Sequence, residues 1–124
     1  MIVGLGLDVV DIDEWEQEVN ARGSTWIERV FNATEQDYCK GQADPYRSFA
    51  GLLAAKEATL KAFGTGWSDD ADWQDIEVLH YHGKPVISIN GALLAARIET
   101  SITRIAVSVT HTKHYAAAVV ILEM

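Results

Sequence analysis

The segment from Asp44 to Gly64 limits the possible folds more than any other part of this sequence. Asp44 is a good helix N-cap, and Pro45 suits the first helical position because a backbone N–H there would have no intrahelical partner. The residues that follow are rich in Ala, Leu, Lys and Glu, and Gly64 can end the helix. The segment therefore predicts one long helix over Tyr46 to Phe63, around which the other elements must pack.

Apolar side chains on this helix recur with a period of about 3.6 residues and predict a stripe that faces the core. The stripe consists of Phe49, Leu53, Leu60 and Phe63. Glu57 and Lys61 are four residues apart, so they should be neighbours on the flank of the stripe. Ala50 and Ala54 lie beside them, and we expect their small side chains to leave room for a ligand.

Shorter patterns predict strands and helices on either side of the long helix. The predicted strands are Ile2 to Val10, Asp75 to Tyr81, Val86 to Asn90, Arg104 to Thr110 and Tyr115 to Leu122. The predicted short helices are Asp11 to Arg22, Ser24 to Phe31, Thr34 to Gly41 and Gly91 to Thr100, with caps at Asp11 or Asp13, at Ser24, and in a Thr34/Asp37 capping box. The fold class is therefore α+β, with an antiparallel sheet wrapped around a long central helix. The last strand is apolar on both faces, so it should be a central or an interface strand.

Length and composition limit the classes of protein that fit. The 124 residues, of which 48% are hydrophobic, suit a single domain over residues 1–124. A net charge of -8 argues against nucleic-acid binding, which depends on clustered Lys and Arg. The apolar start of the chain is too short for a signal peptide, and no stretch approaches the roughly 20 apolar residues that span a bilayer. We therefore expect a soluble, cytoplasmic protein that binds neither nucleic acid nor membrane.

Several short motifs follow one another along nearly the whole chain. They are Ile2-Val-Gly-Leu-Gly-Leu-Asp-Val-Val10, Phe49-Ala-Gly-Leu-Leu-Ala-Ala-Lys-Glu-Ala58, Lys61-Ala-Phe-Gly-Thr-Gly66, Gly83-Lys-Pro85, Val107-Ser-Val-Thr-His-Thr112 and Ala116-Ala-Ala-Val-Val120. Each motif alone is weak, but in this order and spacing the chain resembles the holo-acyl carrier protein synthases, the small single-domain group of phosphopantetheinyl transferases. The resemblance implies a 4'-phosphopantetheinyl transferase-like fold. It also implies transfer of the 4'-phosphopantetheine of coenzyme A to a serine of an acyl carrier protein or carrier domain, with release of 3',5'-ADP, in fatty acid biosynthesis or related lipid metabolism.

Phosphoryl transfer depends on charge neutralisation and in-line positioning, and Mg²⁺ prefers hard oxygen ligands such as carboxylates. The resemblance makes Asp8 and Glu57 the Mg²⁺ ligands that hold the coenzyme A diphosphate. It makes Lys61 a further positive charge beside that diphosphate. His111, by the same resemblance, touches a phosphate, so these four residues are the predicted catalytic group. The base that takes the serine proton stays open between Glu57 and a metal-bound water aligned by Asp8 or Glu57.

The resemblance also assigns residues that bind coenzyme A. They are Arg29, Lys61, Gly64, Thr65, Gly83, Lys84, Pro85, His111 and Thr112. Arg29 matches an arginine that reaches the nucleotide of a neighbouring subunit, because relatives assemble as trimers with active sites between subunits. The resemblance therefore implies a homotrimer whose partners are coenzyme A and an acyl carrier protein or a carrier domain of a large synthase.

The same residues also have plainer interpretations. Asp8 alone would be a strand-end carboxylate that caps the next helix, and Glu57 with Lys61 would be a surface pair worth roughly 0.2 to 0.5 kcal/mol. Only the full set of motifs favours an enzyme. Two other functions stay open: a non-catalytic coenzyme A-binding paralogue, and another Mg²⁺-dependent phosphate enzyme such as a small nucleotide hydrolase, although the chain lacks a Gly-x4-Gly-Lys-Ser/Thr loop.

The first predicted helix departs from the family pattern. Family members typically carry arginines there, which dock the acidic helix of a carrier protein, whereas this chain reads Glu14-Trp-Glu-Gln-Glu18. Such a helix would repel an acidic partner. Our hypothesis is that the carrier is less acidic, such as a domain inside a large fatty-acid or polyketide synthase, and that it contacts Trp15 and its apolar neighbours.

Overall fold

The computed structural model describes residues 1–64 and 72–124, and its helices and strands follow the predicted order. They are β1 (Ile2–Asp11), α1 (Ile12–Arg22), α2 (Ser24–Val30), α3 (Ala33–Lys40), α4 (Pro45–Phe63), the 3₁₀ turn η1 (Trp73–Asp75), β2 (Ile76–Tyr81), β3 (Lys84–Ile89), α5 (Gly91–Glu99), β4 (Arg104–His111) and β5 (Tyr115–Glu123). Their bounds lie within about two residues of the predicted ones, and the α+β class is confirmed. None of the described helices is long and apolar enough to cross a membrane.

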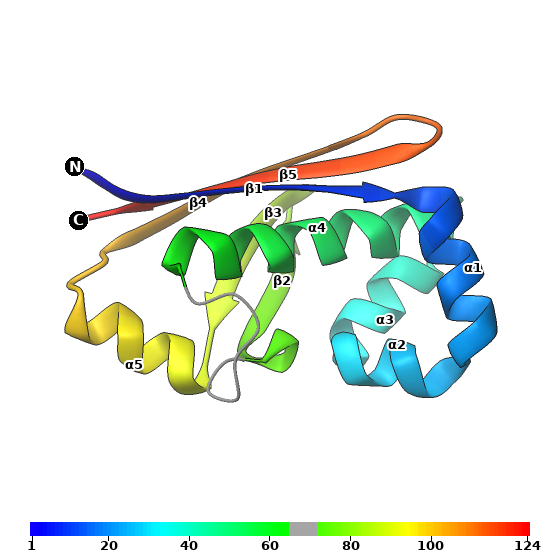
Figure 1. The fold of residues 1–124 in the computed structure, drawn as a ribbon, viewed down its shortest axis with the longest axis horizontal. Coiled ribbons are helices and arrows are strands. Elements are labelled where there is room, and N and C mark those ends of the chain that lie inside the picture. The colour runs from blue at the N-terminus through cyan, green and yellow to red at the C-terminus, as the bar shows by residue number, and fades with distance from the viewer. Residues whose placement is uncertain (65–71) are drawn as a thin grey trace.

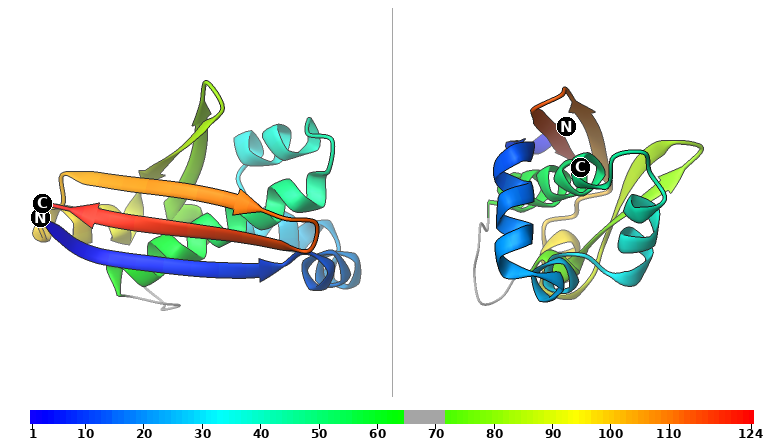
Figure 2. Two further views of the ribbon diagram at one scale, coloured as in Figure 1. Left: turned by 90° about the horizontal axis from the view of Figure 1, so that it is seen from above. Right: turned by 90° about the vertical axis from the view of Figure 1, so that its right-hand side faces the viewer.

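β5 is the central strand of a three-stranded antiparallel sheet with the order β1-β5-β4, as its apolar sequence predicts. Figure 1 shows this sheet lying along one side of α4, and Figure 2 shows its strands side by side from above. β2 and β3 form a separate antiparallel hairpin, and β3 contacts β4 at the edge of the larger sheet. The long helix therefore lies at the centre of the fold, with α1, α2 and α3 gathered at one end of it (Figure 1).

β1 lies very close to α4 because two of its inward-facing residues are glycines. A Cβ atom built on Gly6 would lie 2.8 Å from both the carbonyl carbon of Ala58 and the backbone nitrogen of Ala62, and closer still to the Ala58 carbonyl oxygen. At Gly4, a Cβ atom would meet the Ala62 carbonyl group and a Leu122 methyl carbon, the latter at 2.9 Å. Only residues without a side chain allow this approach, which brings the rest of β1 against the helix.

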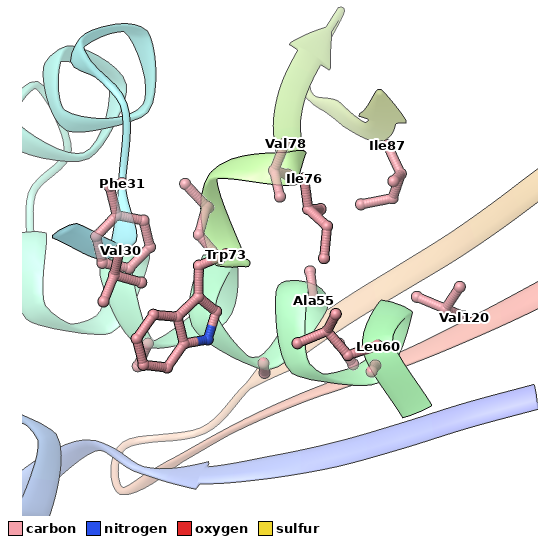
Figure 3. Packing of buried hydrophobic residues seen from close by; sticks show 14 of the residues in the cluster. Val30, Phe31, Ala55, Leu60, Trp73, Ile76, Val78, Ile87 and Val120 are labelled. Carbon is pink, nitrogen blue, oxygen red and sulfur yellow. The ribbon is translucent and has the colours of Figure 1, made fainter. Parts of the chain in front are cut away.

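Buried hydrophobic side chains from the helices and both sheets form one core cluster, part of which is drawn in Figure 3. Phe49 and Leu60 of the predicted apolar stripe are buried, and its other two members are partly exposed. The prediction that Ala50 and Ala54 leave room for a ligand is wrong. Both residues are 0% exposed, because other protein atoms pack against them and fill the space.

A buried ion pair joins α3 to α4. The ammonium group of Lys56 donates a hydrogen bond to Glu35 Oε1 at 2.7 Å, and both side chains are 0% exposed. Lys56 also donates to the carbonyl oxygens of Val30 and Trp73 at 2.8 and 3.2 Å. Burial lowers the pKa of Lys56 and the Glu35 carboxylate opposes that shift. The ammonium group thus has three acceptors, as a buried charge requires.

Glu35 also forms the capping box of α3, together with Asn32. The backbone N–H of each residue donates to the side chain of the other at 2.9 Å. The second carboxylate oxygen of Glu35 accepts the backbone N–H of Val78 at 2.9 Å, which ties α3 to β2. The predicted capping box of Thr34 and Asp37 is therefore wrong, because Asn32 is the extended residue at which the helix begins.

Two further local predictions need correction. Ser24 is not a cap, because Gly23 occupies the N-cap position of α2 and no side chain caps that helix. The predicted strands leave residues 82–85 for the turn of the hairpin, but the turn between β2 and β3 consists only of His82 and Gly83. Their φ angles are positive, at 50° and 79°. Lys84 therefore already belongs to β3, and the tight two-residue turn sets the register of the hairpin.

Candidate active site

Asp8 lies near the end of β1 and faces α4, since it follows Gly6 by two residues on the strand. Its Oδ1 atom accepts a hydrogen bond from Lys61 Nζ at 3.0 Å. The same ammonium group donates to the carbonyl oxygen of Leu7, also at 3.0 Å. The side chain of Asp8 is 16% exposed and that of Lys61 is 53% exposed. A shielded carboxylate and an accessible cation therefore meet where β1 lies against α4.

Glu57 lies one turn before Lys61 on the same face of α4. It is half-buried, and its Oε1 atom accepts a hydrogen bond from the indole nitrogen of Trp73 at 2.8 Å. Lys61 forms its ion pair with Asp8 rather than with Glu57. The structure thus brings Asp8, Glu57 and Lys61 to one place, from two elements that are far apart in the sequence.

The two carboxylates suit a Mg²⁺ ion that also binds substrate phosphates. Within residues 1–64 and 72–124, no group of three or more His, Cys, Asp or Glu side chains is arranged to hold a metal ion. Mg²⁺ needs no such group, because it is commonly bound by one or two carboxylates together with phosphate oxygens and water. Asp8 and Glu57 fit this description. One oxygen of each accepts a known hydrogen bond, and the other has no hydrogen bond to a described residue.

A second set of predicted residues lines a separate cavity of about 150 Å³. Gly83 and Pro85 come from the β2–β3 hairpin, and His111 comes from the end of β4. Ser48 and Gly51 of α4 also line this cavity. The hairpin and the larger sheet therefore enclose a hollow against the N-terminal half of the long helix.

The cavity and the carboxylates lie on opposite sides of α4. Ser48 precedes Glu57 by nine residues, about two and a half helical turns, so the two side chains point in opposite directions. Asp8 and His111 lie on the two edge strands of the sheet, with β5 between them. Within one chain, the predicted site residues therefore form two separate halves.

The remaining predicted residues are less closely associated with either half. Lys84 and Thr112 are exposed on the hairpin and at the end of β4. Gly64 ends α4 in a left-handed conformation with φ 74°, as predicted. Arg29 is exposed on α2 and lines a third, shallow hollow. Thr65 lies outside the described residues.

An aromatic pair beside the 150 Å³ cavity was not predicted from the sequence. The rings of Tyr38 and His80 are stacked, with centroids 3.7 Å apart and planes 8° from parallel, and both residues line the cavity. Burial lowers the pKa of His80, which favours its neutral ring. Because Tyr38 belongs to α3 and His80 to β2, only tertiary packing brings them together, and no local sequence pattern could have indicated the pair.

The hypothesis that a carrier contacts Trp15 is wrong, because this side chain is only 2% exposed. Its ring packs edge-on against Phe31 with centroids 6.0 Å apart. Glu14 is exposed on the same helix, and Glu18 pairs with Arg22 at 3.1 Å. The outer surface of α1 is therefore acidic, as predicted, but it does not offer the Trp15 ring to a partner.

Comparisons with known proteins find similarity over almost the whole chain. Residues 4–120 match the sequence model of the 4'-phosphopantetheinyl transferase superfamily. The holo-[acyl-carrier-protein] synthase of Geobacter sulfurreducens is 39% identical over 124 residues, which cover 99% of this chain and 98% of that protein. That of Solibacter usitatus is 36% identical and is covered to 99%, as is this chain.

Solved structures show the same fold. The holo-[acyl-carrier-protein] synthase of Neisseria meningitidis superimposes with a TM-score of 0.91 at 28% identity, and each chain is covered completely. The synthase of Helicobacter pylori, solved in complex with coenzyme A, superimposes with a TM-score of 0.85 at 27% identity over 96% of this chain and 99% of that one. This chain therefore belongs to the 4'-phosphopantetheinyl transferase superfamily and, within it, to the holo-[acyl-carrier-protein] synthases.

Proposed function

We propose that this enzyme transfers the 4'-phosphopantetheine group of coenzyme A to a serine of an apo acyl carrier protein or carrier domain, in a Mg²⁺-dependent reaction that releases 3',5'-ADP. The observation that carries the proposal is the contact of Lys61 with Asp8. Lys61 lies one turn of α4 after Glu57. These side chains place two metal-binding carboxylates and one accessible cation together, as phosphoryl transfer requires. Such an enzyme would act in the cytoplasm, in the synthesis of fatty acids or related lipids.

In this reaction the serine oxygen of the carrier attacks the β-phosphorus of coenzyme A. The new oxygen–phosphorus bond forms while the bond to the bridging oxygen of the α-phosphate breaks, and the serine loses its proton. Negative charge grows on the departing 3',5'-ADP. Lys61 is 53% exposed, so its ammonium group can turn from Asp8 toward that charge and stabilise it. Mg²⁺ held by Asp8 and Glu57 would neutralise the pyrophosphate oxygens and align them for in-line displacement.

We further propose that the active form is a homotrimer, in which the two halves of the site meet across subunit interfaces. The outer face of the three-stranded sheet supports this arrangement, because β1 exposes apolar side chains there. Leu5, Leu7 and Val9 are 64%, 61% and 59% exposed. A contiguous apolar face of this kind marks an interaction surface. A neighbouring subunit on this face could bring its His111 toward Asp8, which one subunit alone keeps on opposite edge strands.

Complementation between inactive variants tests the shared site. Asp8→Ala and His111→Ala should each transfer phosphopantetheine poorly when expressed alone. In randomly mixed oligomers of both variants, about a quarter of the sites would receive an intact Asp8 half and an intact His111 half. We therefore expect activity to return after co-expression. Activity no greater than the mean of the separate variants would place the whole site within one subunit.

The activity itself is tested by the mass of the carrier after incubation with coenzyme A and Mg²⁺, with EDTA as the control. We expect the carrier to gain one phosphopantetheine, and Asp8→Ala and Glu57→Ala each to abolish the gain. Release of nucleotide without carrier modification would instead support a Mg²⁺-dependent phosphate hydrolase. Binding of coenzyme A without turnover of any carrier would support a non-catalytic paralogue.

We propose that the natural carrier docks with a surface less acidic than that of an ordinary acyl carrier protein, such as a carrier domain of a large fatty-acid or polyketide synthase. The exposed Glu14 and its acidic neighbours on α1 support this, since like charges across an interface oppose binding. The initial rate on the natural carrier should therefore change little with added NaCl. A steep fall with salt would mean that opposite charges steer the encounter, which contradicts the proposal.

A further inference from the structure

Trp73 belongs to none of the predicted functional sets, yet it contacts one of the two carboxylates directly. It opens the short turn η1, which follows α4 in the described chain, and its side chain is 6% exposed. Its indole N–H donates a hydrogen bond to Glu57 Oε1 at 2.8 Å. A buried donor therefore fixes one oxygen of a carboxylate whose other oxygen has no hydrogen bond to a described residue.

Contacts with other described residues hold Trp73 in this position. Its carbonyl oxygen accepts a hydrogen bond from the buried ammonium group of Lys56 at 3.2 Å, and Lys56 is in turn paired with Glu35. Its ring packs edge-on against Trp26, with centroids 5.2 Å apart and planes at 87°. Figure 3 shows the ring within the hydrophobic cluster, beside α4. The donor is thus fixed by packing and by the buried ion pair, so its direction is set before any ligand binds.

The hydrogen bond also decides which partner Glu57 takes. Glu57 and Lys61 are four residues apart on α4, a spacing at which glutamate and lysine commonly form an ion pair. In this structure Lys61 pairs with Asp8, and Glu57 accepts from Trp73 instead. Loss of the indole N–H would leave Glu57 able to turn toward Lys61 and away from the space beside Asp8.

We propose that Trp73 is a positioning residue, whose indole N–H holds Glu57 Oε1 so that the second oxygen is directed to the divalent cation shared with Asp8. The inference rests on the proposed function of Asp8 and Glu57 as metal ligands. Partners that orient metal ligands commonly change metal affinity by about 10- to 100-fold when they are removed. Trp73 acts through Glu57 and does not itself contact substrate or metal.

The test compares Trp73→Phe with Trp15→Phe. Both changes replace a buried indole by a phenyl ring, but the indole nitrogen of Trp15 has no hydrogen-bond partner among the described residues. Binding of Mn²⁺ in the presence of coenzyme A is measured from the electron paramagnetic resonance signal of the free ion. We expect affinity to fall about 10- to 100-fold in Trp73→Phe and to change less than about twofold in Trp15→Phe. Equal affinities in the two variants would overturn the inference.

Two further measurements separate the possible failures. Benzothienylalanine at position 73 keeps the ring shape and lacks the N–H donor, so it should weaken Mn²⁺ binding even if Trp73→Phe proves unstable. In ¹⁵N-labelled protein, the indole N–H resonance of Trp73 should shift when Glu57→Ala removes the acceptor, and its constancy would contradict the contact. If wild-type protein transfers phosphopantetheine but position 73 has no effect on Mn²⁺ affinity, only this inference fails. If wild-type protein neither binds Mn²⁺ nor transfers the group, the proposed function fails as well.

Discussion

Replacing Gly6 by alanine should separate β1 from α4 and thereby move Asp8 away from Lys61. The new Cβ atom would lie 2.8 Å from backbone atoms of Ala58 and Ala62, whereas non-bonded carbons prefer about 3.5 to 4.0 Å. The Ala58 carbonyl oxygen would lie closer still, so the strand must move by at least about 1 Å, since the helix backbone cannot yield locally. Overpacking of this kind costs about 1 to 3 kcal/mol in stability. A displacement of about 1 Å in a positioned group can also lower the rate about 100-fold.

Gly41→Ala is the matched control, because Gly41 has a φ of -81° and a Cβ atom there would meet its nearest atoms at 3.6 Å, an ordinary contact. Both variants are compared by urea unfolding at one protein concentration and by the initial rate of carrier modification. Gly6→Ala should lose stability and most of its activity, while Gly41→Ala should resemble wild type. A Gly6→Ala protein with wild-type stability and rate would refute the claim that close backbone approach positions Asp8.

Three other outcomes follow from the structure. Lys56→Met should lower the free energy of unfolding by about 3 to 5 kcal/mol, because it leaves Glu35 buried without its cation. In urea unfolding, the double variant Lys56→Met/Glu35→Gln should lose less stability than the sum of the losses of the two single variants. Burial lowers the pKa of His80 from its ordinary value of 6.5, so the unfolded chain takes up the proton first as pH falls. The contribution of His80 to folding stability is therefore present above pH 6.5 and is lost at lower pH. His80→Phe should reduce the pH dependence of the free energy of unfolding. Leu7→Asp, on the exposed sheet face, should lower the oligomer mass in sedimentation, and an unchanged mass would exclude that face as the interface.

The sequence predicted the elements well because their signals are local. Asp44 and Pro45 begin α4 and Gly64 ends it, and each acts through its own backbone conformation or its immediate neighbours. The predicted caps at Ser24 and Thr34 were wrong because they rested on local signals alone. Thr34 resembles a cap in isolation, but Asn32 is preferred because its partner Glu35 is also held by the buried ammonium group of α4.

The site was predicted only in part, because its geometry depends on tertiary contacts. The motifs pointed to Asp8 and Lys61, but the close approach that joins them depends on what faces Gly6 across the interface, and the sequence does not show that. Ala50 was predicted to leave room for a ligand, whereas protein atoms bury its side chain completely. Trp73 was overlooked because its N–H meets Glu57 across 16 residues of chain, a separation with no local pattern.

The central claim is that Asp8 and Glu57, from β1 and α4, bind one divalent cation that holds the pyrophosphate of coenzyme A. The most direct measurement is a crystal structure with coenzyme A and Mn²⁺, in which anomalous scattering locates the metal ion. The account predicts one strong peak bound by an oxygen of each carboxylate and by phosphate oxygens. A peak that is absent, or one whose ligands exclude Asp8 or Glu57, would contradict it.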